Sequence, residues 1–417
     1  MKLQPIPSRS KFFIAYVGVL MITMARLSVA SDVDSQAAAA STKLDADLPA
    51  KKHFPTGKLQ GRIQLRHDVF DGGYSNNSER TTADYVARAN IKLSGKLSKK
   101  LAYDLKVELN EKKNVTLKTA TLAYRLSKKN WLVVGHFKPE FGMEQIGSSS
   151  WTTAIERSAI WDLTPDKSDA QDVHTVGIEE IYTSKHLYLS VAGQHRASGY
   201  NWTTRMVAAP IHHQRHMLHF GLSYLNQRID NQDGQIRSRL GVRGVSVADN
   251  GNQLRLARAS DNDFEDDQTG VLEFAYMRGA FSVQSEVLRR QLTGGDGQKM
   301  RSATGSYVQL AYTLTGESRN YQLEGGKFSG ITPTNKHWGA WEVFYRHDDL
   351  QVRGEVGMLK KKRSAANARV DVAGVNGYLS PALRFSANYL QANTQGVVND
   401  VGVDEGKAVS IQIQWLF

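Results

Sequence analysis

Cysteine is absent from this 417-residue chain, so it has neither a disulfide framework nor thiolate chemistry. Proline is scarce, with nine residues, as expected of a chain rich in strands. After residue 30 no apolar run reaches the roughly 20 residues that a membrane-spanning helix needs. The HExxH, GxSxG, P-loop and dinucleotide-binding motifs are also missing, and no catalytic pair of residues stands out. These absences disfavour an enzyme and predict no cofactor.

The N-terminus has the three parts of a secretory signal peptide. Lys2, Arg9 and Lys11 form a positive flank, residues 12–25 are mostly apolar, and residues 28–30 (Ser-Val-Ala) are small. A retained anchor is the alternative, but the apolar run is shorter than a membrane-spanning helix. We therefore predict that residues 1–30 are a signal peptide and that the chain is exported.

The chain is basic, with 53 Lys and Arg against 41 Asp and Glu and a formal net charge of +12. Residues 1–30 contain only a few of these cations, so the mature chain stays basic. A basic balance favours nucleic acid, anionic lipid or small anions as partners. Because an exported protein rarely meets nucleic acid, we expect small anions such as phosphate and chloride, and the phosphates of lipopolysaccharide.

Two regions of different sequence character follow the predicted signal peptide. Residues 31–57 show no β pattern, and we interpret them as a flexible periplasmic segment. From Leu59 onward, apolar and polar residues alternate, which indicates strands with two unlike faces. The alternation is clear in residues 59–67, 85–97, 101–109, 218–224 and 383–389.

Alternation alone would also fit a soluble sandwich. However, segments of about ten residues recur along the whole chain between polar turns, which is typical of a transmembrane barrel. Strands can span lipid only as a closed barrel, because every backbone group must be hydrogen-bonded internally. We predict an all-β, transmembrane antiparallel β-barrel over residues 58–417, in the outer membrane of a Gram-negative cell.

The last predicted strand carries apolar residues at every second position and ends the chain on Phe417. A terminal aromatic residue on an alternating strand resembles the signal by which the barrel-assembly machinery recognises its substrates. We therefore predict that Phe417 is an assembly signal and that this machinery is a partner.

Four stretches together resemble the phosphate-selective porin O and P family: residues 151–157, 236–246, 310–317 and 339–346. The likeness runs from about Gly61 to Phe417. It implies a barrel of 16 strands, a homotrimer, a constriction loop folded into the lumen, and an arginine-rich path for anions.

The family's functional residues match this chain only in part. Three arginines fall at the places of a family run of pore arginines: Arg237, Arg239 and Arg243. The first arginine of that run is replaced by Gln235. Arg88 matches the second member of an adjacent arginine pair, whose first member is Ala87 here, and Ser150 replaces a lysine of the central site. The resemblance thus implies a general anion path more than a central phosphate site.

The residues themselves support an anion path. The even spacing of Arg237, Arg239 and Arg243 predicts that they share one face of one strand, opposite Ile236 and Leu240. Lipid cannot accept them, since each arginine near the midplane costs about 2–4 kcal/mol. Arginine's planar fork binds two phosphate oxygens, and a row of such sites lets an anion move between neighbours. The alternative is a solvated strand face with balancing carboxylates.

The next strand segment gives a second candidate wall of the path. In residues 85–97 we place Tyr85 and Ala87 on the apolar face, and Arg88 and Lys92 on the opposite, lumenal face. Asp104 and Glu108 of the following segment could pair with these cations, which is the alternative to an anion path.

A Gly/Ser-rich stretch supplies candidates for a constriction. Hydroxyls and free backbone N–H groups of Ser148, Ser149 and Ser150 could bind an anion. The alternative is an ordinary loop.

Three further patterns have simpler interpretations. The four histidines of residues 212–219 cross a turn into a strand, so we expect a turn and rim rather than a metal site. The acidic run of residues 261–267 lacks the glycine that a calcium loop has at its sixth position, and we interpret it as an external loop. The basic residues 360–363 fit a loop tip that can touch lipopolysaccharide.

Taken together, the sequence predicts an outer-membrane porin for passive diffusion of small anions, phosphate or related oxyanions first. One alternative is a general or organic-acid porin on the same scaffold without phosphate selectivity. An alternative of another class is a barrel enzyme or an adhesin. The missing catalytic motifs disfavour the enzyme, and the absence of a long external insertion disfavours the adhesin.

Overall fold

The computed structural model describes residues 54–110, 114–164, 174–196, 199–232, 234–257, 264–294, 300–354, 364–397 and 402–417. The predicted signal peptide, most of residues 31–57 and the basic residues 360–363 lie outside this part of the chain. Within the described residues, no helix has both the length and the apolar character to cross a bilayer.

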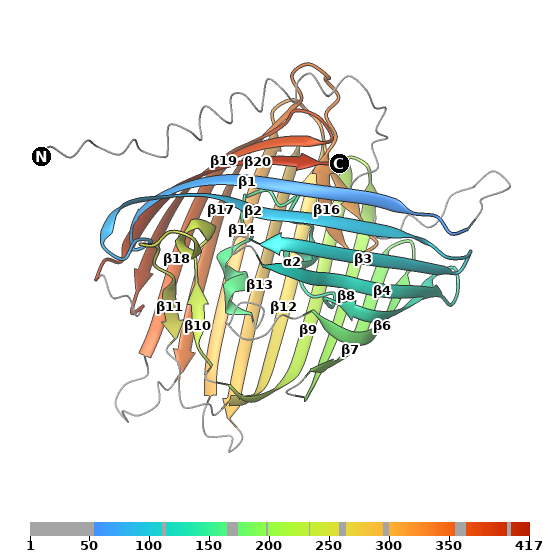
Figure 1. Ribbon diagram of the computed structural model, residues 1–417, viewed down its shortest axis with the longest axis horizontal. Helices are drawn as coiled ribbons and strands as arrows, with labels where there is room; N and C mark the ends of the chain where they lie inside the picture. Colours follow the sequence, from blue (N-terminus) through green and yellow to red (C-terminus); the bar gives the residue numbers. More distant parts are fainter. Residues whose placement is uncertain are drawn as a thin grey trace, which may run out of the picture. The chain divides into compact units, whose positions relative to one another are not determined.

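Sixteen antiparallel strands form a closed barrel, as predicted from the alternation and from the family resemblance. Figure 1 shows these long strands side by side, with β1 next to β20. In barrel order they are β1 (Lys58–Gly72), β2 (Ser78–Lys96), β3 (Leu101–Asn110), β4 (Val115–Arg125), β5 (Asn130–Phe137), β6 (Thr175–Thr183), β7 (Leu187–Arg196), β8 (Gly199–His213), β9 (His216–Gln232), β12 (Phe264–Arg278), β13 (Phe281–Gly294), β14 (Met300–Thr313), β17 (Ala340–Gly354), β18 (Ser364–Tyr378), β19 (Leu383–Gln395) and β20 (Glu405–Leu416).

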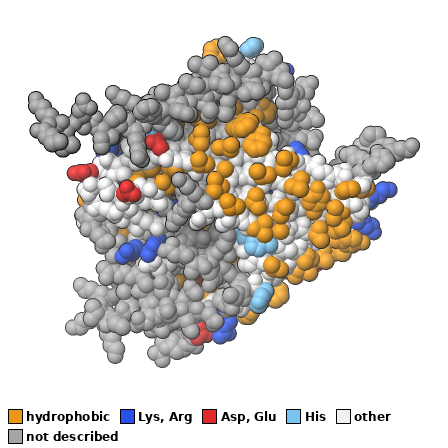
Figure 2. All heavy atoms as spheres, viewed as in Figure 1, with side chains coloured by type: hydrophobic (Ala, Val, Ile, Leu, Met, Phe, Trp, Pro, Cys, Tyr) orange, Lys and Arg blue, Asp and Glu red, His pale blue; other side chains and the backbone are white. Residues whose placement is uncertain are grey.

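Alternation places apolar side chains on the outer face of the barrel. On β9, Phe220, Leu222 and Tyr224 are exposed, whereas Ser223 and Gln227 point inward and are buried. Side chains at successive positions of a strand leave opposite faces of the sheet. Figure 2 shows apolar side chains gathered on the side of the molecule where β3 and β4 run. This outer apolar surface is the one a barrel presents to lipid.

A β-bulge on β2 changes which residues face the lumen. Gln64 of β1 pairs with Arg88, but Leu65 pairs with Val86, so Ala87 is an extra residue. A bulge of this kind re-aims the side chains beside it. Ala87 is completely buried and the Tyr85 hydroxyl donates to Asp68 inside the barrel, 2.7 Å away. Our placement of Tyr85 and Ala87 on the outer face was therefore wrong.

Among the described residues, three connections between barrel strands contain helices or strands, and we call them inner segments. The first inner segment (residues 138–164) holds α2 (Met143–Ile146) and η1 (Ala159–Leu163). The second (residues 234–257) holds β10 (Ile236–Ser238), η3 (Arg243–Ser246) and β11 (Leu254–Ala257). The third (residues 314–339) holds β15 (Arg319–Gln322) and β16 (Lys327–Ile331).

The antiparallel order fixes where the inner segments enter. The first follows β5 and the second follows β9, so both enter from the end opposite the barrel's termini. The third follows β14 and enters from the end where β1 begins and β20 ends. All three contact inward-facing side chains of the barrel, as the predicted inward-folded loop requires.

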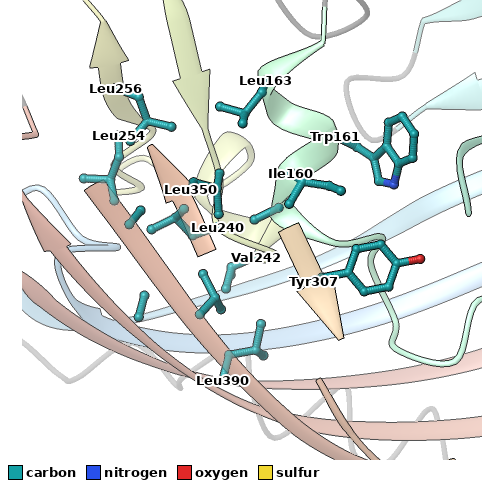
Figure 3. Close-up of a cluster of buried hydrophobic side chains, with 14 of the residues drawn as sticks. Ile160, Trp161, Leu163, Leu240, Val242, Leu254, Leu256, Tyr307, Leu350 and Leu390 are labelled. Atoms are coloured by element: carbon teal, nitrogen blue, oxygen red, sulfur yellow. The ribbon is translucent and has the colours of Figure 1, made fainter. Parts of the chain in front are cut away.

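An apolar core lies inside the barrel, beneath the second inner segment. Figure 3 shows Leu240, Val242, Leu254 and Leu256 of that segment beside η1 and the inward-facing side chains of barrel strands. The barrel residues of this core include Leu350 on β17, Val370 on β18 and Leu390 on β19. Burying one such side chain stabilises the folded protein by about 1.5–3 kcal/mol. Packing against this core therefore holds the second inner segment in one position.

Candidate functional site

Side chains of the barrel wall hold the first inner segment by hydrogen bonds. Arg62 donates to the Ser149 and Ser150 hydroxyls, each 2.9 Å away. Arg384 donates to the carbonyls of Ser150, at 3.0 Å, and Thr153, at 2.9 Å. Ser149 and Ser150 are therefore buried against β1 and β19. Of the three predicted constriction serines, Ser148 is the one whose side chain is exposed.

Further arginines contact backbone carbonyls of the same segment. Arg346 on β17 donates to the Glu156 carbonyl, at 2.9 Å, and Arg290 on β13 donates to the Leu163 carbonyl, also at 2.9 Å. Arg319 of the third inner segment donates to the Trp151 carbonyl at 2.8 Å. The same guanidinium groups also face carboxylates: Arg346 lies 3.0 Å from Asp348, and Arg290 lies 2.8 Å from Asp267. Together these contacts fix the first inner segment in place.

Three arginines from separate elements converge on the carboxylate of Glu156. Arg66 of β1 contacts its Oε1 at 2.7 Å, and Arg243 of η3 contacts Oε1 at 2.9 Å and Oε2 at 3.3 Å. Arg88 of β2 lies 3.9 Å from Oε2. The structure thus brings together Arg88 and Arg243, two residues that the sequence predicted for the anion path.

Glu156 is ionised despite its burial. Burial alone would raise the pKa of its carboxyl, but the guanidinium groups of Arg243, Arg66 and Arg88 hold that pKa well below the usual value. Asp68 and Glu108 also act on this cluster, but five arginines (Arg62, Arg66, Arg88, Arg157 and Arg243) face these three carboxylates, so an excess of positive charge remains. An excess of fixed cations lowers the barrier for an anion in a pore.

The second inner segment positions Arg243 through its neighbours. Asp68 of β1 accepts a hydrogen bond from the Gly244 backbone N–H at 2.8 Å. The Tyr74 hydroxyl donates to the Leu240 carbonyl at 3.0 Å, and Ser75 forms a β-bridge with Gly251. The segment is thereby tied to the β1–β2 connection as well as to the apolar core.

Arg237, Arg239 and Arg243 do not lie on one strand, so that prediction was wrong. β10 ends at Ser238, and Leu240 has a positive φ of 44°. The chain turns there because Leu240 enters the apolar core, and η3 begins at Arg243. Arg237 and Arg239 remain partly exposed near β10, whereas Arg243 is buried.

The first inner segment also supports the turn after β10. Asp162 of η1 accepts hydrogen bonds from the Ser238 hydroxyl at 2.7 Å and from the Arg239 backbone N–H at 3.1 Å. The position of the predicted path arginines therefore depends on both inner segments. Sequence spacing along one of them could not give it.

Lys92 pairs with a carboxylate of the neighbouring strand, which was the alternative to a place on the anion path. Its Nζ lies 2.6 Å from Asp104 on the neighbouring β3. Glu108 on β3 lies 3.2 Å from Arg62 and 3.8 Å from Lys106. Cations and carboxylates therefore alternate on this part of the wall, where Lys92, Asp104 and Lys106 remain partly exposed.

Several residues that shape the site were not predicted from the sequence. Arg62 and Arg66 stand on the polar face of the first strand, but their even spacing on a lumenal face was a usable signal. Glu156 lies inside a block that resembles the family. Nothing in the sequence indicated that it would meet Arg66 and Arg243, which are far away along the chain.

The histidines of residues 212–219 differ from each other. His213 and His216 flank a turn, as expected, whereas His219 is buried inside the barrel. Its ring nitrogens lie 2.7 Å from the Tyr321 hydroxyl and 3.2 Å from Glu273. Across the described ranges, no group of three His, Cys, Asp or Glu residues is placed to hold a metal ion.

Comparisons with known proteins agree with the sequence and the barrel. Residues 58–417 match the family model described as phosphate-selective porin O and P. Porin O of Pseudomonas aeruginosa is 34% identical over 385 residues, covering 86% of this chain and 88% of that protein.

Solved barrels share the fold at low identity. The anion-selective porin from Comamonas acidovorans has a TM-score of 0.55 at 10% identity, covering 87% of this chain and 100% of that one. The outer membrane channel DcaP of Acinetobacter baumannii has a TM-score of 0.53 at 8% identity, covering 87% and 97%. At such identities these structures support the fold alone. The family match and the relative at 34% identity carry the assignment, and the chain belongs to the phosphate-selective porin O and P family of outer-membrane porins.

Proposed function

We propose that this porin passes small anions by passive diffusion, phosphate and related oxyanions among them. The path is lined by Arg88, Lys92, Arg237, Arg239 and Arg243, near the constriction candidates Ser148, Ser149 and Ser150. The observation that carries the proposal is the convergence of Arg66, Arg88 and Arg243 on a single carboxylate, which leaves the cluster positively charged.

The surrounding contacts explain how such a cluster can stay charged and ordered. Arg62, Arg346 and Arg384 donate to hydroxyls and carbonyls of the first inner segment and so keep it ordered. Arg62 and Arg346 also lie beside Glu108 and Asp348. Arg384 donates to carbonyl and amide oxygens, so its charge adds to the potential that attracts an anion. Exchange between neighbouring guanidinium groups then lets the anion leave.

Weak phosphate selectivity is expected, which keeps the general or organic-acid porin as the second candidate. Ala87 stands where the family has an arginine, and it is completely buried beside the bulge. The Ser150 hydroxyl accepts a hydrogen bond from Arg62 and supplies no cation. A tight phosphate site needs several converging cations in a desolvated place, and three family positions that supply them are neutral here: Ala87, Gln235 and Ser150.

Export and assembly complete the proposal. Residues 1–30 act as the signal peptide, residues 31–57 as a periplasmic segment, and residues 58–417 as the barrel. Phe417 acts as the signal for the barrel-assembly machinery, and the barrel contacts lipopolysaccharide at its outer rim. The chain assembles as a homotrimer; in support, OmpT of Vibrio cholerae, solved in a trimer form, shares the fold with a TM-score of 0.51 and 11% identity over 87% of this chain and all of that one.

Current through single channels in planar bilayers tests the proposed cargo. With KCl on both sides, we expect added phosphate to reduce the chloride current only at millimolar concentrations. Block by micromolar phosphate would show that other residues complete a tight site. Equal or stronger block by a small dicarboxylate than by phosphate and sulfate would favour the organic-acid porin.

A further inference from the structure

The carboxylate of Glu156 occupies the guanidinium groups that an oxyanion would need. Arg66 and Arg243 both donate to it, and Arg88 lies within 3.9 Å. These arginines come from two barrel strands and from the second inner segment, whereas Glu156 belongs to the first. Its side chain is only 9% exposed, so the contact is largely shielded from water.

A carboxylate and a phosphate compete for the same donors. The planar fork of arginine matches two oxygens of either group. A carboxylate attached to the chain is present at a high effective concentration, whereas a diffusing anion is present at its concentration in solution. The Glu156 carboxylate is therefore bound to the arginines most of the time. Its negative charge also repels a diffusing anion at short range.

We propose that Glu156 is a built-in counter-anion that determines how weakly this pore holds a passing oxyanion. The inference rests on the proposed anion-pore function and assigns a specificity-determining role to a residue of negative charge. A phosphate ion needs two or more oxygens bound at once, so it loses most when the arginine forks are occupied. Chloride needs no such fork and is less affected.

The backbone around Glu156 is held by contacts that do not use its carboxylate. Arg346 donates to its carbonyl, and Asp348 accepts from the Ala159 backbone N–H at 2.9 Å. Arg384 holds the carbonyls of Ser150 and Thr153. Replacing the carboxylate should therefore leave the first inner segment in place and change mainly the charge that the arginines meet.

The test is block of chloride current by inorganic phosphate in Glu156→Gln. We expect the phosphate concentration for half-block to fall by about tenfold or more, because a like charge a few ångströms from the anion is removed. Glu156→Ser is measured in parallel, and both variants are first checked for heat-modifiable barrel. A purely structural Glu156 would instead give noisier or larger conductance with no gain in phosphate block.

Two controls separate charge at this place from charge elsewhere. Glu156→Asp keeps the carboxylate and should block like the unmodified protein. Glu144→Gln removes a carboxyl group from the same inner segment but outside the cluster: Glu144 accepts from the Ser158 N–H at 2.9 Å and the Trp161 indole at 3.1 Å, and it lies 3.8 Å from Arg346. Its half-block concentration should stay nearly unchanged.

The outcomes distinguish this inference from the pore proposal. Unchanged or weaker phosphate block in both Glu156→Gln and Glu156→Ser, in a pore that still prefers chloride to potassium, overturns the counter-anion role alone. An equal gain in Glu144→Gln overturns it as well, because the effect would not depend on the cluster. A cation-selective unmodified pore would overturn the proposed function itself.

Discussion

The inner faces of two barrel walls differ in kind. The wall of β1 to β3 presents Arg62, Arg66 and Arg88 to the first inner segment, with lysines and carboxylates further along. The wall of β17 to β19 presents Leu350 and Leu390, among other apolar residues, to the second inner segment. The β1–β3 wall is therefore charged and supports an anion path. The β17–β19 wall contacts the first inner segment through Arg346 and Arg384, but its apolar part packs against the second inner segment like the core of a soluble domain.

The outer faces also differ. On β17 and β18, part of the outer face is polar and pairs across the strands: His347 lies 2.8 Å from Asp371, and Arg369 lies 3.0 Å from Asp349. Val343 and Tyr345 are apolar outward residues of the same β17 strand. On β9 the corresponding outward positions are Phe220, Leu222 and Tyr224. Alternation along a strand thus shows that its two faces differ, but it does not show which face lies inside the barrel.

The seam between the two walls should give the largest effect when broken. Phe417 pairs with Gly61 through Gly61 N–H to Phe417 O at 2.7 Å and Phe417 N–H to Gly61 O at 3.0 Å, and a Cβ at Gly61 would overlap the aromatic ring. Deleting Phe417 removes these contacts and the predicted assembly signal. We expect most of the assembled, heat-modifiable barrel to be lost from the outer membrane on gel analysis. Full assembly of the deleted chain would contradict the prediction.

A charge placed between the second inner segment and the apolar part of the β17–β19 wall should have the next largest effect. Leu240→Asp puts a carboxylate into the core beneath the second inner segment. It should weaken the packing of that segment against the barrel by more than about 3 kcal/mol. We expect limited proteolysis to cut the second inner segment much faster while the barrel strands stay protected. Asn250→Asp adds the same charge at an exposed position of this segment, and it should leave the rate unchanged. Equal proteolysis rates for the two variants would show that packing of Leu240 does not hold the second inner segment in place.

The sequence predicted the barrel well and the site in part, for physical reasons. Strand alternation is local, so residues 218–224 revealed two unlike faces without any knowledge of their neighbours. The bulge at Ala87 depends on the register with β1, and the turn at Leu240 depends on a core made by other strands. Neither the bulge nor the turn can therefore be predicted from the sequence of its own segment.

The convergence of three arginines on Glu156 could not be predicted from local sequence patterns either. Arg66, Arg88 and Arg243 are single residues on three elements, and only the folded inner segments bring them within reach of one carboxylate. Spacing along the chain placed Arg243 with Arg237 and Arg239, whereas packing of Leu240 turned it toward the β1 wall.

A small effect is expected on the charged wall where cation and carboxylate are already paired. Lys92 and Asp104 are partly exposed, and exposed pairs contribute about 0.2–1 kcal/mol. Asp104→Asn removes the carboxylate that lies 2.6 Å from Lys92, so one negative charge leaves this wall. The preference for chloride should therefore rise slightly while barrel stability hardly changes. The ratio of chloride to potassium permeability measures this. A fall in that ratio would indicate that Lys92 does not face the path.

If the charged wall makes this porin an anion path, the reversal potential in a KCl gradient will show it. Fixed guanidinium charge should admit chloride in preference to potassium, so the unmodified pore should show a reversal potential of anion-selective sign. Replacing Arg88 and Arg243 with glutamine should move that potential toward zero. A reversal potential of cation-selective sign in the unmodified protein would contradict the account.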